Sequence, residues 1–292
     1  MKASAFSYAR ATSVVNALEL LVAHGDKAKV LSGGQSLMPA MNLRLISPEL
    51  IVDIGEIAEL RGIAVSGDVL TIGALTRHVD LARSPEIAAH APLLTEAVAH
   101  IAHPAIRNRG TLGGSLAHAD PAAELPACMV ALNATMIIRS QSGERRVAAE
   151  SFFTGIYETA LSPQELLVAV ELPIGRNSVH FFCELARRHG DYAIVGLAAQ
   201  AIFERDVCAD LCLAFFAVGD RPVSARAAKK LVNVAITPAV LSDASTALAE
   251  EFDPQSDQQA SASMRRHLAK VLLKRCVSAL LGRPDLNVGE PA

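Results

Sequence analysis

Aromatic residues and net charge are both scarce in this sequence of 292 residues. It contains no tryptophan, three tyrosines and 4% aromatic residues in total, and its formal net charge is −3. A chain without a large positive field has little attraction for nucleic-acid phosphates or anionic lipids. We therefore expect no binding to nucleic acid.

Long hydrophobic runs and a cysteine framework are missing as well. The longest apolar stretches, near residues 125–138 and 193–203, are shorter than the ~20 residues of a membrane-spanning helix, and the N-terminus has no sustained apolar segment of the export type. The five cysteines are odd in number and scattered, unlike those of small secreted proteins. We expect reduced thiols, no membrane span and a cytoplasmic location.

Metal ligands are not expected. Cys208 and Cys212 form the one close cysteine pair, without the second pair or the histidines that a zinc or iron–sulfur site needs. If both lie on a strand, their thiols point to the same face and pack as small apolar groups. His100 and His103 have no evident third ligand, and Pro104 interrupts the helix there.

The composition is that of a globular protein, with 51% apolar and 20% charged residues. A chain of this length corresponds to about two domains of ~150 residues each. The first segment predicts strand, helix, strand, helix and strand, with a helix capped at Thr12 or Ser13, a short helix over residues 37–43 and a strand over residues 50–53. Alternating residues at 63–65 and 69–73 predict a β-hairpin.

Residues 104–126 are rich in glycine and proline and show little periodicity, so we expect a long functional loop there. A hairpin over residues 136–148 and a strand over 166–172 follow. We place a domain boundary between residues 175 and 176, with subdomains of about 1–57 and 58–175 before it. Residues 176–292 predict three antiparallel strands, then helices near 225–234, 238–250 and 260–281. The fold class is therefore α+β.

Two glycine pairs stand out, Gly33-Gly34 after a strand and Gly113-Gly114 within the expected loop. Consecutive glycines allow successive N–H groups to point at one anion, and a helix that starts at Ser36 adds its own N–H groups. Two such segments suit the two halves of a pyrophosphate. The alternative is that each pair is a tight turn.

A dinucleotide site of the Rossmann type is the obvious competitor, because Asp53 ends a strand twenty residues after Gly33. However, the segment from Gly33 lacks the spacing G-x-G-x-x-G and has Met38 where the third glycine is needed. We interpret Asp53 as a strand-end or turn residue.

The segment SGGQSLMP (residues 32–39), followed by IRNRGTLGGSLAHADPAAELP (106–126), resembles the FAD-binding medium subunits of molybdenum hydroxylases, the group that includes carbon monoxide dehydrogenase and xanthine dehydrogenase. The resemblance extends over residues 157–173 and 190–193. It implies a PCMH-like FAD domain of two subdomains, then a C-terminal domain with a three-stranded sheet. It also implies a large molybdopterin subunit and a small subunit with [2Fe–2S] clusters as partners.

The resemblance assigns FAD contacts to two backbone segments and several side chains. The residues implied are Leu31, Ser32, Gly33, Gly34, Gln35, Ser36, Leu37, Met38, Ile101, Thr111, Gly113, Gly114, Ser115, Asp120, Glu124, Leu167 and Tyr192. Cys183 and Glu184 stand where relatives often have a lysine near the flavin. From the residues alone, Asp120 and Glu124 could instead be turn or helix-start acids, and Arg107 and Arg109 a solvated face or partner contacts.

No nucleophile and no carboxylate pair suited to acid–base catalysis is evident. This fits a flavoprotein, because the cofactor supplies its own redox chemistry. The resemblance implies an electron-transfer subunit that accepts electrons from the clusters of a partner and passes them to an external acceptor. The alternatives are a stand-alone FAD oxidoreductase with its own substrate and a flavin-free scaffold subunit.

Overall fold

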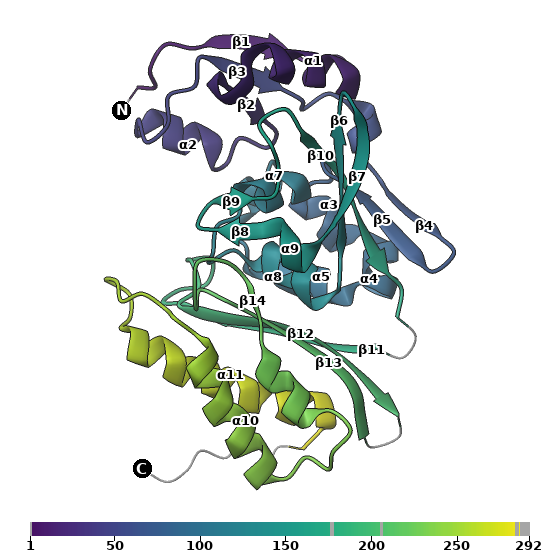
Figure 1. Ribbon diagram of the computed structural model, residues 1–292, viewed down its shortest axis with the longest axis vertical. Helices are drawn as coiled ribbons and strands as arrows, with labels where there is room; N and C mark the ends of the chain where they lie inside the picture. Colours follow the sequence, from purple (N-terminus) through teal and green to yellow (C-terminus); the bar gives the residue numbers. More distant parts are fainter. Residues whose placement is uncertain (1, 176–177, 205–206, 284–285, 287–292) are drawn as a thin grey trace.

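The computed structural model describes residues 2–175, 178–204, 207–283 and 286. Its elements stack in three parts along the long axis of the molecule (Figure 1): an N-terminal α/β part, a central part built on a mixed helix and sheet layer, and a C-terminal part. This is the predicted α+β fold. No helix in these ranges combines the length and the apolar character that a membrane span requires.

The N-terminal part follows the predicted order of elements. They are β1 (Ser7–Arg10), α1 (Val14–His24), a 3₁₀ turn η1 (Gly25–Lys27), β2 (Ala28–Leu31), α2 (Leu37–Asn42) and β3 (Leu50–Asp53). The strands form a parallel sheet in the order β1-β3-β2. Ser13 caps α1 by accepting a hydrogen bond from the Asn16 N–H, and the apolar face of α1 packs on this sheet.

The central part holds an antiparallel sheet in the order β4-β5-β10-β6-β7. Its strands are β4 (Ile63–Ser66), β5 (Val69–Gly73), β6 (Thr135–Ser140), β7 (Gly143–Ala148) and β10 (Leu166–Pro173). The other elements are η2 (Ala58–Leu60), α3 (His78–Arg83), α4 (Pro85–His90), α5 (Pro92–His100), α6 (Pro104–Arg107), α7 (Leu112–His118), α8 (Glu124–Ala131), α9 (Ala149–Phe152), β8 (Phe153–Gly155) and β9 (Glu158–Thr159).

The prediction of a long loop over residues 104–126 is wrong. The segment contains α6, α7 and the start of α8, each of four to eight residues. Helices this short show barely two turns of periodicity, and both faces of α8 are buried, so no polar side interrupts its apolar residues. The glycine- and proline-rich composition therefore gave no signal for these three helices.

The C-terminal part contains β11 (Ser178–Leu185), β12 (Val195–Glu204), β13 (Val207–Phe216), β14 (Val223–Ser224), η3 (Arg226–Leu231), α10 (Pro238–Glu251) and α11 (Ala262–Leu281). The three predicted strands pair in order, and the short β14 extends the sheet. One face of the sheet packs on α10 and α11, while Ala198, Ala214 and Phe216 on the other face join the core of the central part. This second face forms the seam between the two predicted domains.

The two cysteines of β13 lie on opposite faces of the sheet, and the prediction of a shared face is wrong. Opposite Ile202 and Phe203 of β12 the register shifts, so that one residue between Cys208 and Asp210 is extra. Cys212 donates its Sγ–H to the carbonyl of Val130 in α8, at 3.5 Å, whereas Cys208 lies near Cys276 of α11. All five cysteines are free.

Candidate FAD site between the two glycine segments

The first glycine segment leaves the end of β2 with its backbone donors free. Among the described residues, no acceptor bonds the N–H groups of Gly33, Gly34, Gln35 or Ser36. Gly34 has φ +71°, a conformation that side chains disfavour, and a Cβ added there would lie 3.1 Å from Leu31 Cδ1 and 3.4 Å from Met38 Cγ. Free backbone donors in succession are the kind of group that binds phosphate oxygens.

The carboxylate of Asp53 is hydrogen-bonded within the protein at a turn, as the sequence predicts. Its carboxylate accepts hydrogen bonds from the Gly55 N–H, at 2.8 Å, and from the Tyr8 hydroxyl, at 2.5 Å. Both oxygens therefore stabilise the end of β3 and are not available as a ribose acceptor of the Rossmann type.

The two glycine segments meet directly. The Oγ of Ser32 and the Oγ1 of Thr111 are 2.7 Å apart, although 79 positions separate them in the sequence. A Cβ on Gly33 would lie 2.3 Å from the carbonyl oxygen of Arg109, so the two backbones touch at a point where only glycine fits. The sequence prediction that both segments border one site is consistent with this contact.

The second glycine pair does not expose its N–H groups, and in this respect the prediction is wrong. Gly113 and Gly114 lie in the first turn of α7, where Gly113 donates to the Ala74 carbonyl at 2.8 Å and Gly114 donates to Thr111 Oγ1 at 3.1 Å. A Cβ on Gly113 would come within 2.6 Å of the Ala74 Cβ. This pair lets α7 approach the end of β5, where the side chains of Thr111 and Ser115 make hydrogen bonds within the protein.

His78 is a supporting residue that the sequence analysis missed. Its Nε2 lies 3.1 Å from the Thr111 carbonyl oxygen and 3.0 Å from Ser115 Oγ. Burial lowers the pKa of His78 to about 4, so the ring is neutral at pH 7. It therefore fixes both ends of the α7 first turn. The sequence signal for this role of His78 was weak, because it consists of one histidine at the start of a short helix.

Asp120 ends the second segment between two exposed tyrosines. Its Oδ1 accepts a hydrogen bond from the Ala122 N–H at 2.9 Å, and its side chain is buried. Tyr157 and Tyr192 are 56% and 64% exposed, and burial of their hydroxyl ends followed by the charge of Asp120 raises the pKa of each. The ring of His118 contacts that of Tyr157 in a tilted arrangement, with centroids 5.0 Å apart. A buried acidic acceptor thus lies beside two exposed aromatic side chains.

Glu124 and Glu184 form a second acidic group, at the seam between the domains. Burial raises the pKa of Glu124 to about 7 and that of Glu184 to about 8, and the charge of Glu124 contributes to the latter shift. Glu184 Oε1 lies 3.4 Å from His100 Nδ1. Glu184, in the region where relatives often have a lysine, therefore faces a histidine, and the charge of Glu124 acts on it.

Three further predicted or discussed residues have different environments. Ile101 is half-buried at the end of α5, next to the core. Leu167 is only 4% exposed and packs inside the sheet core, so the structure does not bring it to the open site. Arg107 donates to the carbonyls of Ile101 and Ala102, at 2.8 and 3.2 Å, and so caps the end of α5. Neither alternative considered for Arg107, a solvated face or a partner contact, describes this structural role.

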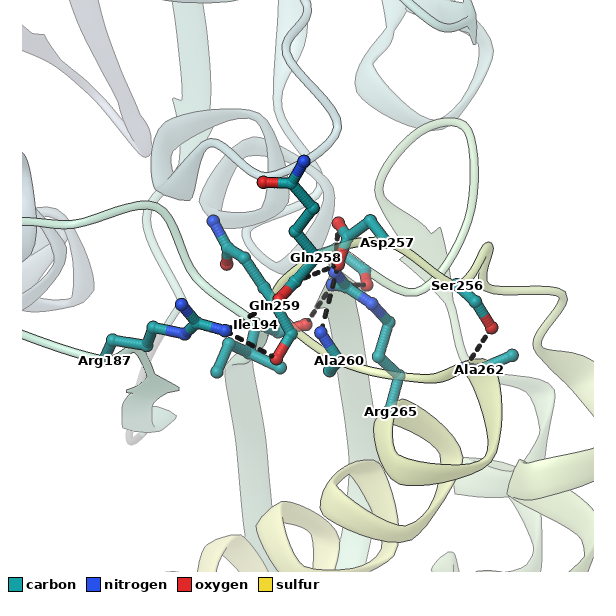
Figure 2. Close-up of polar contacts among 10 residues, drawn as sticks. Arg187, Ile194, Ser256, Asp257, Gln258, Gln259, Ala260, Ala262 and Arg265 are labelled. Atoms are coloured by element: carbon teal, nitrogen blue, oxygen red, sulfur yellow. Dashed lines mark hydrogen bonds and ion pairs between the residues drawn. The ribbon is translucent and has the colours of Figure 1, made fainter.

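The loop that carries Tyr192 is anchored by two arginines of the C-terminal part (Figure 2). Arg265 donates to the carbonyls of Ile194 and Ala217 and pairs with Asp257 at 2.6 Å. Arg187 donates to the Gln258 carbonyl at 2.7 Å. The backbone on both sides of Tyr192 is therefore fixed, while its ring stays exposed.

Comparisons with known proteins agree with this geometry. The FAD binding domain in molybdopterin dehydrogenase matches residues 4–175, and the CO dehydrogenase flavoprotein C-terminal domain matches residues 180–280. The chain therefore belongs to the family of FAD-binding flavoprotein subunits of molybdopterin dehydrogenases. Within that family it corresponds to the medium subunit, part of an oxidoreductase, with FAD as its cofactor.

Individual relatives match over nearly the whole chain. The 6-hydroxypseudooxynicotine dehydrogenase complex subunit alpha of Paenarthrobacter nicotinovorans is 38% identical and covers 97% of each chain. The carbon monoxide dehydrogenase medium chain of Hydrogenophaga pseudoflava is 35% identical over 95% of this chain and 98% of its own. A solved carbon monoxide dehydrogenase from the same organism superimposes with a TM-score of 0.95, at 35% identity, over 97% of this chain and 99% of its own.

The residues present fit FAD. Free N–H groups from Gly33 to Ser36 suit a diphosphate, Asp120 suits hydroxyl groups, and Tyr192 offers an exposed ring for stacking. No group of three or more metal-ligating side chains occurs in the part of the chain that the structure describes.

Proposed function

We propose that this chain is the electron-transfer subunit of a molybdenum-containing hydroxylase, taking electrons from [2Fe–2S] clusters of a partner and passing them to an external acceptor. The observation that carries the proposal is the meeting of the two glycine segments at Ser32 and Thr111, beside four free backbone donors. FAD, when bound, supplies the conversion between single-electron and two-electron transfer.

The residues of the chain have distinct roles in this proposal. The N–H groups of Gly33, Gly34, Gln35 and Ser36 hold diphosphate oxygens, flanked by the side chains of Leu31, Leu37 and Met38. Thr111 and Ser115 close the other side, with Gly113 and Gly114 allowing the approach of α7. Asp120 and Glu124 accept hydrogen bonds from sugar or ribityl hydroxyls, and Tyr192 and Ile101 border the ring system. Leu167 supports the site only from the core.

The relatives support the proposed partners. Carbon monoxide dehydrogenase medium chains and the FAD-binding subunit of xanthine dehydrogenase are named as parts of larger enzymes. We propose a heterotrimer in the cytoplasm with a large molybdopterin subunit and a small iron–sulfur subunit. We also propose domains of residues 1–175, with subdomains of about 1–57 and 58–175, and 176–292. The limits agree with β10 ending at Pro173 and β11 starting at Ser178; residues 176–177 lie outside the described ranges.

Native co-purification tests the proposal. The complex should contain molybdenum, iron and flavin together. The chain alone should show flavin absorption bands at about 370 and 450 nm. A flavin-free chain would indicate the scaffold alternative. Flavin reduced directly by a small substrate, in the absence of the other subunits, would indicate the stand-alone oxidoreductase and contradict the proposed role.

A further inference from the structure

His78 is a buried histidine whose ring is held against the second glycine segment. Its backbone N–H donates to the Gly110 carbonyl at 2.9 Å. A Cβ on Gly110 would lie 2.8 Å from the His78 Cε1 and 2.9 Å from its Nδ1, so the ring packs against the bare Cα of that glycine. The ring therefore has one orientation relative to the turn that begins α7.

The surroundings of the ring determine which of its nitrogens carries the proton. Nε2 lies 3.1 Å from the Thr111 carbonyl oxygen, which can only accept a hydrogen bond. Nδ1 is buried and has no partner within the described ranges. A buried N–H without an acceptor is rarely tolerated, and burial keeps the ring neutral at pH 7 by lowering its pKa to about 4. The single ring proton therefore belongs on Nε2.

This proton determines how the hydroxyl of Ser115 can be used. Ser115 Oγ lies 3.0 Å from the same Nε2, and His78 is its one hydrogen-bond partner among the residues that the structure describes. An N–H shared between the Thr111 carbonyl and Ser115 Oγ occupies one acceptor position of the hydroxyl. The O–H of Ser115 is thus left to donate to another group.

The hydroxyls of Ser32 and Thr111 also leave one O–H unused. Thr111 Oγ1 accepts from the Gly114 N–H at 3.1 Å and lies 2.7 Å from Ser32 Oγ. Whichever hydroxyl donates across this contact, the O–H of the other is left over. Thr111 and Ser115 are four positions apart, which places them on one side of the helix turn, and Ser32 directly precedes the free N–H of Gly33.

We propose that His78 is a positioning residue for the FAD diphosphate: by donating from Nε2, it leaves the Ser115 O–H to donate to a diphosphate oxygen. This inference rests on the proposed function, in which Ser115 borders the diphosphate. A ring with its proton on Nδ1 would instead accept from Ser115 and leave only hydroxyl lone pairs for the anion. Ser115 thus differs from Gly113 and Gly114, whose hydrogen bonds remain within the protein.

The first test uses the cofactor-free chain with isotopically labelled histidine. Proton–nitrogen correlation spectra distinguish the two neutral forms of a histidine ring from each other and from the charged ring. At pH 7 we expect the Nε2–H form for the signal that is absent from His78→Gln. The matched control His103→Gln should leave this signal unchanged. A ring protonated on Nδ1, or on both nitrogens, would overturn the positioning role.

The second test measures FAD affinity by fluorescence titration. Ser115→Ala should lower the affinity about tenfold, as expected for one lost hydrogen bond to a charged group. Ser142→Ala, in an exposed hairpin, is the control and should leave the affinity unchanged. In a His78→Leu background, where the hydroxyl can turn, Ser115→Ala should cost only about threefold. His78→Gln keeps an N–H donor and should retain more of the affinity than His78→Leu.

The outcomes of the titration are distinct. If Ser115→Ala binds FAD as tightly as the wild-type chain, the positioning role is wrong, whether or not His78→Leu folds. A tenfold loss in both backgrounds would mean that His78 only supports the fold, which also overturns the inference. Flavin that is reduced directly by a small substrate, with these affinities as expected, would contradict the proposed electron-transfer function alone.

Discussion

The Gly33-Gly34 pair and the Gly113-Gly114 pair look alike in the sequence, yet the structure uses them differently. The first pair leaves backbone donors free, and the second pair has every N–H bonded within the protein. We propose that the first provides contacts for a ligand, whereas the second provides room for α7 to pack on Ala74. Substitutions in the first segment should change ligand affinity, and substitutions in the second should change stability.

The largest effect is expected for Gly113→Val. Its added Cβ would lie 2.6 Å from the Ala74 Cβ and 2.9 Å from the Ala74 carbonyl oxygen, so backbone must move. We expect a loss of about 3 kcal/mol in the free energy of unfolding, measured by denaturant titration of the cofactor-free chain. Ala117→Val, on the exposed side of α7, is the control and should cost only about 0.5 kcal/mol. Equal losses in the two variants would contradict the packing role.

Acid should weaken the second segment through His78. The pKa of His78 is about 4 in the folded chain because of burial, below the ordinary 6.5, so the unfolded chain binds the proton more readily. This contribution to stability is complete above pH 6.5 and is lost as the pH falls through about 4; it amounts to about 3 kcal/mol. Unfolding measured against pH should show a weaker acid dependence in His78→Gln.

The matched control for this prediction is His103→Gln, which removes an exposed histidine at the start of α6. Its acid dependence should follow that of the wild-type chain. If His78→Gln and His103→Gln give the same curve as the wild type, His78 does not hold the α7 turn in its neutral form.

Sequence reasoning succeeded where a local pattern determines local structure. The alternation at residues 63–73 and the helix cap at Ser13 are short-range signals, and both elements formed as predicted. The turn role of Asp53 followed from the missing third glycine. The two glycine segments, followed by the acidic Asp120, were enough to identify the family. Their order is visible in the sequence and does not depend on the fold.

The failures come from contacts between distant residues. The use of the Gly113 N–H depends on Ala74, and the faces of Cys208 and Cys212 depend on one extra residue in β13. His78 became relevant only when α7 folded against it. None of these contacts leaves a periodic signal in its own segment, so a pattern read along the chain cannot show them.

A charge placed in the first segment should lower ligand affinity far more than stability, although Gln35 Nε2 donates to the Gly33 carbonyl at 3.3 Å. Gln35→Glu puts a carboxylate among the free N–H groups, where it repels a diphosphate. We expect FAD affinity to fall about tenfold or more, about 1.4 kcal/mol, in a fluorescence titration. The same change at the exposed hairpin residue Gln141 is the control and should leave affinity unchanged. A loss of stability in place of affinity would mean that the first segment is structural, like the second.

The smallest effect concerns the contact that joins the two segments. Ser32→Ala removes the hydroxyl 2.7 Å from Thr111 Oγ1, which should cost about 1 kcal/mol in the free energy of unfolding. Ser140→Ala removes a similar hydroxyl contact, 2.8 Å from Ser142, in an exposed hairpin, and should cost less because water replaces it. Thr111 also caps α7, so its substitution removes both the helix cap and the contact with Ser32.

A double-mutant cycle with Ser32→Ala and Thr111→Ala separates those two losses, because the cap term cancels and only the coupling between the side chains remains. A coupling near 1 kcal/mol in the cofactor-free chain would show that the protein brings the two segments together before FAD arrives. Strictly additive losses would show that the ligand must bring them together. In that case the meeting point at Ser32 and Thr111 could not be a preformed part of the site.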